Sequence, residues 1–270
     1  AGVPVSIVLG GAAGLGLGYV LAKCFTRFHL RDSAKVVVLL ALEALMVAGW
    51  MFTNSHGNHV DFYTGAGMLC VMLALGFYAT LLTCDMVFAD QYKNGTMKNE
   101  VSFGIPRTRI YLGKFLVSLA VSLLFMAVMA AFYLGLCYLA LFHDPEADAV
   151  AMQMVGYCLL TALPLWVGVL ACTCAFRFLI KSDLWASVAS VCVFAVIPPV
   201  MEVCMALFSA NPAGTVIRFL YQYMPTVMVD NAPSVVGGWS YCGQAWIVGA
   251  VWLAVFSVLG AVWFRRKEIN

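Results

Sequence analysis

Long apolar runs separated by short polar segments dominate the pattern along the chain. Six of them reach the length of about 20 residues that an α-helix needs to cross a bilayer. They cover roughly residues 35–54, 65–88, 111–142, 150–177, 184–208 and 244–264. The runs are continuous, whereas the strands of a membrane β-barrel alternate between apolar and polar residues. We therefore predict an all-α integral membrane protein with six spans.

Composition supports this class, because 63% of the 270 residues are hydrophobic and only 10% are charged. A soluble domain carries about 25% charged residues. The fifth run contains Pro198 and Pro199, which remove two backbone donors. We expect a kink or a break there.

The cations are distributed unevenly, and this predicts the orientation. All but one of the 15 Lys and Arg residues fall on the same side of a six-span path, and Arg218 is the exception. The positive-inside rule makes that side cytoplasmic. We expect a multi-pass protein of the cell membrane with a cytoplasmic C-terminus. The cations of the basic side are Lys23, Arg27, Arg31 and Lys35 before the first span, Lys93, Lys98, Arg107, Arg109 and Lys114 after the second, Arg177 and Lys181 after the fourth, and Arg265, Arg266 and Lys267 after the sixth.

Residues 1–22 form a further hydrophobic segment, which precedes the six-span domain of residues 23–270. It is uncharged and carries Gly10, Gly14 and Gly18 at a spacing that permits close helix contact. It is expected to be an extra span, or else a re-entrant or interfacial segment.

The loop from Asp90 to Ile110 is the most polar interval of the chain. Its first part can form a short helix, and Gly104 and Pro106 end it. Such a helix at the membrane surface suits a cytoplasmic partner. A solvated loop whose cations only set the topology explains the same charges.

The segment "FADQYKNGTMKNEVSFGIPRTRIYLGK" resembles the signature segment of type-2 ABC transporter permeases, the membrane-spanning subunits of ATP-binding-cassette exporters. The ending "WFRRKEIN" is similar to the close of that family. Pro106 stands where the family usually has Ser. The matching positions are Asp90, Gly95, Thr96, Lys98, Gly104, Pro106, Arg107, Ile110, Tyr111 and Lys114.

The resemblance implies a six-helix type-2 ABC exporter domain. A coupling helix at about 90–105 would dock a cytoplasmic ATPase dimer, two permease chains, identical or related, would pair, and an outer re-entrant segment would lie at about 209–240. Because the sequence has no G-x-x-x-x-G-K-[ST] segment, we expect ATP and Mg²⁺ on a separate subunit and neither a catalytic residue nor a cofactor on this chain. The docking residues would be Asp90, Lys93, Gly95, Thr96, Lys98, Glu100 and Arg107.

Two acidic residues lie inside the apolar runs. Glu43 is near the middle of the first and Glu202 is in the outer half of the fifth. Intramembrane carboxylates commonly face a cavity or a helix contact, so both are candidates for a substrate path or gate and both also have structural interpretations. Arg218 is expected to pair with Glu202 or Asp230, or to meet lipid headgroups.

The family transports antimicrobial peptides, drugs, lipids and lipid-linked glycans, so we expect an amphipathic or hydrophobic substrate. An ATPase-independent channel or sensor is the alternative function, and an intramembrane enzyme is a third class without a supporting motif. Membrane lipids are expected partners. No metal site and no nucleic-acid partner is expected.

Overall fold

The computed structural model describes residues 32–55, 60–88, 96–180, 182–208 and 212–266. The predicted segment 1–22 lies outside them. Within the described residues the fold is all-α. An isolated β-bridge joins Phe142 to Asp61, and the carbonyl oxygen of Phe142 accepts a 2.9 Å hydrogen bond from the backbone N–H of Phe62.

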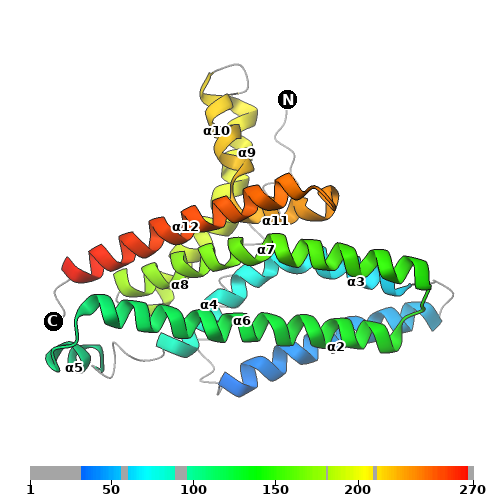
Figure 1. The fold of residues 1–270 in the computed structure, drawn as a ribbon, viewed down its shortest axis with the longest axis horizontal. Helices are drawn as coiled ribbons and strands as arrows, with labels where there is room; N and C mark the ends of the chain where they lie inside the picture. The colour runs from blue at the N-terminus through cyan, green and yellow to red at the C-terminus, as the bar shows by residue number, and fades with distance from the viewer. Residues whose placement is uncertain (1–31, 56–59, 89–95, 181, 209–211, 267–270) are drawn as a thin grey trace.

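The helices match the predicted runs closely (Figure 1). Five helical stretches are long and apolar enough to cross a membrane, while the first contributes a shorter apolar stretch, Val36–Phe52. The fold is therefore that of an all-α membrane protein. The stretches are α2 (Asp32–Ser55), α3 (Phe62–Met72) with η1 (Leu73–Leu75) and α4 (Gly76–Phe88), α6 (Arg107–Ala140), α7 (Pro145–Leu179), α8 (Asp183–Val191) with η2 (Cys192–Val196) and α9 (Ile197–Leu207), and α12 (Trp239–Arg266).

Helix α7 is the centre of the bundle. About 72% of its most apolar window is buried inside the protein, against 17% for α6 and for α12. Its closest neighbour is α12, where Gly168 and Gly249 let the two backbones approach. A methyl group at Gly249 would lie 2.3 Å from the carbonyl oxygen of Pro164 in α7. Small residues serve this purpose in membrane helix packing.

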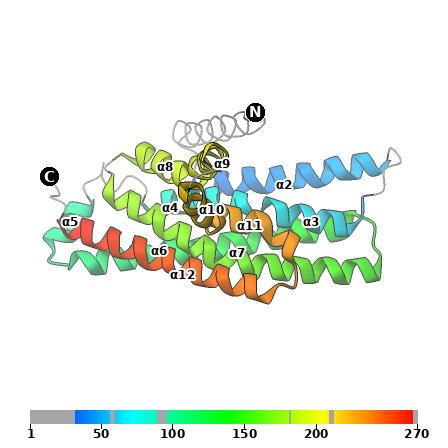
Figure 2. The ribbon, with the colours of Figure 1, turned by 90° about the horizontal axis from the view of Figure 1, so that it is seen from above.

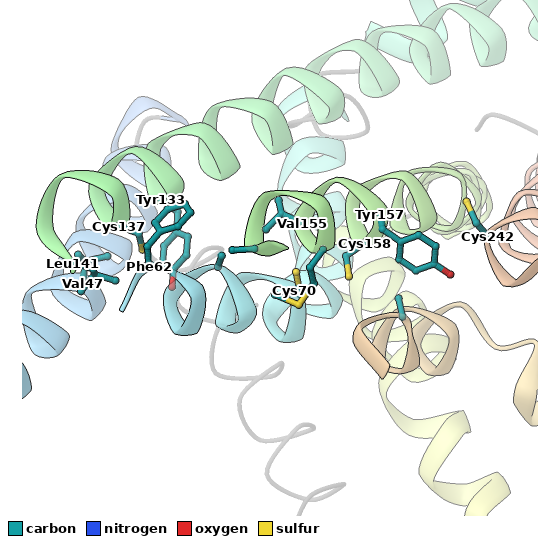
Figure 3. Close-up of a cluster of buried hydrophobic side chains, with 14 residues drawn as sticks. Val47, Phe62, Cys70, Tyr133, Cys137, Leu141, Val155, Tyr157, Cys158 and Cys242 are labelled. Carbon is teal, nitrogen blue, oxygen red and sulfur yellow. The ribbon is translucent and has the colours of Figure 1, made fainter. Parts of the chain in front are cut away.

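Buried apolar side chains form a cluster between α2, α3, α6 and α7 (Figure 3). Phe62 and Tyr133 fill its centre, and the Tyr133 hydroxyl donates to the carbonyl oxygen of Gly65 at 3.1 Å. Elsewhere, hydroxyl pairs join the helices, as between Thr80 and Thr173 at 3.3 Å. Such pairs satisfy polar groups that hydrocarbon would leave unbonded.

Two spans are interrupted. In the second, the 3₁₀ turn η1 separates α3 from α4, and Trp166 of α7 donates its indole N–H to the carbonyl oxygen of Gly76, the first residue of α4, at 2.5 Å. In the fifth, the π-helical turn η2 directly precedes Pro198 and Pro199, and the N–H of Ile197 bonds the carbonyl of Cys192. The predicted kink at the proline pair is confirmed.

After η2 the chain leaves the bundle. Helix α9 and the following α10 (Pro212–Gln222) project as a pair across the long axis of α6, α7 and α12 (Figure 1). Seen from above, both are viewed end-on near the middle of the molecule (Figure 2). Helix α11 (Pro225–Asn231) and the turn η3 (Ala232–Val235) then pack back onto α7, burying Val227, Met228 and Val229.

Candidate functional site

A short helix and a tight turn form one end of the bundle, which we call the basic end. It comprises α5 (Thr96–Ser102), the turn 103–106, the first turns of α6 and the last turn of α12 (Figure 1). Helix α6 has 34 residues, or about 51 Å at 1.5 Å per residue, so it exceeds a hydrocarbon core of about 30 Å. Its first turns and α5 can therefore stand outside the bilayer.

Helix α5 ends where the sequence predicts. The N–H groups of Phe103 and Gly104 bond the carbonyls of Asn99 and Val101, both at 3.0 Å, and Gly104 has a left-handed φ of 79°. A glycine just past a helix takes this conformation at little cost. Pro106, with its fixed φ, then precedes the first residue of α6.

The predicted docking residues fall into three groups. Asp90, Lys93 and Gly95 lie outside the described residues, so their role stays a prediction. Thr96 and Lys98 belong to α5, of which the structure describes the backbone. Glu100 and Arg107 make defined contacts with other elements.

Glu100 ties α5 to α6. Its carboxylate lies 3.2 Å from the ammonium group of Lys114, whose side chain is only 11% exposed. Because Lys114 is largely buried, solvent screens this ion pair less than it would screen a pair on the surface. On the same helix, Val101 packs against buried side chains below α5. Helix α5 is thereby attached at two points.

Arg107 ties α6 to α12. Its guanidinium donates to the carbonyl oxygens of Phe264 and Arg265, at 3.1 and 3.0 Å. The last carbonyls of a helix lack intrahelical partners, and a cation there also complements the helix dipole. Arg107 thus caps the end of α12. A shallow pocket of about 360 Å³ opens beside it, lined by Pro106, Arg107, Thr108 and Arg265.

Aromatic side chains form a buried cluster against which α5 packs. Phe178 of α7 lies at the centre, with ring centroids 5.0 Å from Phe88, 4.8 Å from Tyr111 and 4.7 Å from Phe264. These rings come from α4, α6 and α12 and are buried. The basic end therefore joins four spans into one packed unit.

The turn after α5 also carries exposed apolar groups. Phe103 is 84% exposed and Ile105 is 40% exposed. The docking residues predicted from the sequence are mostly polar and include neither Phe103 nor Ile105. An apolar pair inside the most polar interval of a membrane protein is the signal that singles them out.

A buried cation lies close by. Arg177 of α7 is 3% exposed and reaches Asp183 at 3.1 Å, Asp85 at 3.5 Å and the hydroxyl of Ser187 at 2.9 Å. It joins the ends of α4, α7 and α8. From the sequence, Arg177 is predicted only to mark the cytoplasmic side. Buried arginines that pair with two carboxylates tie elements together because their geometry is fixed.

The two intramembrane carboxylates are in different settings. Glu43 in α2 is half-buried, and its Oε2 atom has no hydrogen-bond partner among the described residues. The hydroxyl of the neighbouring Tyr133 is already bonded to Gly65. Glu202 in α9 accepts a hydrogen bond from the hydroxyl of Tyr221 in α10.

These features define a multi-pass membrane protein with an apolar bundle and a clamped helical loop at one end. A family model described as ABC-2 family transporter protein matches residues 31–199, more than half of the chain. The chain belongs to this family, and it is a membrane permease of an ABC transporter. A comparison with curated proteins finds no match.

Proposed function

We propose that the chain is the membrane subunit of an ATP-driven exporter whose energy comes from a separate cytoplasmic ATPase dimer. The observation that carries this proposal is the basic end, where α5 and the exposed Phe103 form a projecting surface on a rigid base. Well-packed aromatic anchors dominate the energy of protein interfaces. The concentration of cations at this end supports a cytoplasmic location and, with it, a cytoplasmic C-terminus.

Force from the ATPase would enter at α5 and follow the contacts described above. The pair Glu100–Lys114 passes a displacement to α6, and Arg107 passes it to the end of α12. The rings around Phe178 extend it to α4 and α7. Packed elements shift as units rather than deform continuously, so a small movement of α5 would reorient four spans.

The substrate we propose is amphipathic or hydrophobic, such as an antimicrobial peptide, a drug or a lipid. Two permease chains would enclose its path. Glu43 supports a polar point on that path, since its buried Oε2 atom has no partner among the described residues. Glu202 is the second candidate, at the contact of α9 with α10.

The test replaces Phe103 by Ala in the full chain, co-expressed with its candidate ABC ATPase. We expect the permease to bind the ATPase about 30-fold more weakly, because truncating an aromatic anchor costs about 2 kcal/mol. The matched control is Phe142→Ala, which removes an exposed ring (56%) between α6 and α7 at the opposite end of the bundle. Copurification and ATP hydrolysis in detergent are the measurements.

Equal ATPase binding by the wild-type chain and the Phe103 variant would reject Phe103 as the anchor. The absence of any ATPase bound to the wild-type chain would reject the proposed function itself. A loss caused equally by the Phe142 control would point to damaged folding rather than to docking.

A further inference from the structure

The helices α9 and α10, which we call the arm, project from the bundle and expose apolar side chains. The two helices pack mainly on each other. Their outward side chains are apolar, with Leu207 67%, Val216 58% and Phe219 57% exposed. The arm runs across the direction of the spans and begins near the middle of the bundle (Figure 1 and Figure 2). Its surface therefore lies within the apolar layer.

Two opposite charges in this region have no counter-charge among the residues that the structure describes. Arg218 is exposed on α10, and Asp230 is exposed on α11, directly after the arm. Among the described residues neither forms an ion pair or a side-chain hydrogen bond. Of the intrachain partners expected for Arg218, Glu202 is bonded to Tyr221 instead. Charged side chains in an apolar layer are costly unless they are paired.

The two charges are complementary, and they lie on α10 and α11, which are consecutive helices in contact with each other. In a two-fold symmetric contact, residue i of one chain meets residue j of the other, and j meets i in return. One cation and one carboxylate on adjacent helices can therefore satisfy each other twice when two identical surfaces meet. The exposed apolar residues of α10 would be covered by the same contact.

We propose that the arm is the contact surface for a second copy of this chain, with Arg218 of each copy facing Asp230 of the other. This rests on the pairing of two permease chains proposed above and names the surface that does it. A lipid-covered arm would leave Arg218 and Asp230 of each copy without a counter-charge among the described residues. The two-fold contact pairs all four charges.

Charge reversal in trans tests the proposal. Two copies with different tags are co-expressed, solubilised and captured by one tag, and the other copy is measured. We expect wild-type copies to copurify and two copies of Arg218→Asp, or two of Asp230→Arg, to copurify at least about 10-fold less, the loss that about 1.4 kcal/mol produces. An Arg218→Asp copy with an Asp230→Arg copy should copurify like wild type, since both cross-chain pairs are restored.

The mixed pair separates this contact from an intrachain one, because neither chain then carries both opposite charges. Glu146→Arg, which reverses an exposed charge in the first turn of α7, is the control and should have no effect. If a reversed variant is not monodisperse, Arg218→Cys and Asp230→Cys chains, both with Cys204→Ser, replace it, and a disulfide between the two tagged chains is expected.

Unchanged copurification of the single reversals, or failure of the mixed pair and of the cysteine pair, overturns the arm contact while chain pairing stands. Failure of the wild-type copies to copurify overturns the pairing of identical chains as well. ATPase binding at the basic end is independent of all these results.

Discussion

Replacing Gly249 by Ala perturbs the closest contact between α7 and α12. The new methyl carbon would lie 2.3 Å from the carbonyl oxygen of Pro164 and 2.4 Å from its carbonyl carbon. Favourable carbon contacts need about 3.5 Å, so the helices must separate by about 1 Å. Both atoms belong to the backbone of a buried helix, and no side-chain rotation relieves the clash.

The expected cost follows from two opposing effects. Overpacking of this kind costs up to about 3 kcal/mol. Ala in place of Gly favours the helix by about 1 kcal/mol. We therefore expect Gly249→Ala to lower the free energy of unfolding in detergent by about 2 kcal/mol, measured by chemical unfolding.

Gly243→Ala is the matched control on the same helix. No atom lies within 4 Å of its added methyl group, so only the helix preference remains, and the variant should be as stable as wild type or up to about 1 kcal/mol more stable. Equal effects of the two substitutions would refute the conclusion that glycine permits the α7–α12 approach.

Two further predictions concern charged groups. The hydrogen bond with Asp148, at 2.8 Å, raises the pKa of His143 above its usual value of about 6.5. The other ring nitrogen lies against the carbonyl oxygen of Tyr138. Because both ring nitrogens face acceptors, the protonated imidazolium, which donates from both, is favoured. This stabilisation is complete below the unfolded pKa and disappears as pH rises through the raised one. His143→Asn should therefore lower thermal stability below about pH 6 and leave it unchanged in alkaline buffer; a loss independent of pH would contradict this. Arg177→Met should cost about 2–3 kcal/mol in chemical unfolding, because two carboxylates lose their counter-charge, and adding Asp183→Asn should recover part of it. No recovery would show that the pair contributes little.

The spans could be predicted because hydropathy and length determine them, but their boundaries depend on other atoms. The sequence predicts the fourth span at about residues 150–177, and the helix runs from Pro145 to Leu179. Asp144 caps its start by accepting from the N–H of Glu146. The η1 turn had no sequence signal, since Leu73–Leu75 is uniformly apolar and its neighbour Trp166 comes from another helix. The proline pair predicted a bend but not its direction.

In the candidate site, the short helix and its glycine stop were readable because both are local features. The partners were not, because they depend on the tertiary fold. Arg107 bonds carbonyls more than 150 positions away, and Glu100 pairs with a lysine on the next helix. Exposure is also a tertiary property, which is why Phe103 was overlooked among polar neighbours.

The central place of α7 has a consequence for synthesis. Its partners come from both sides of the sequence: α3 and α4 are made before it, and α12 is the last helix of the described chain to be made. Until Gly249 and Trp252 have entered the bilayer, Gly168 of α7 lacks the α12 neighbours that pack against it in the described structure. The middle of the bundle is thus completed last. A truncated chain that lacks α12 would keep its early helices but leave the α12-binding face of α7 exposed to the cell's quality-control proteases.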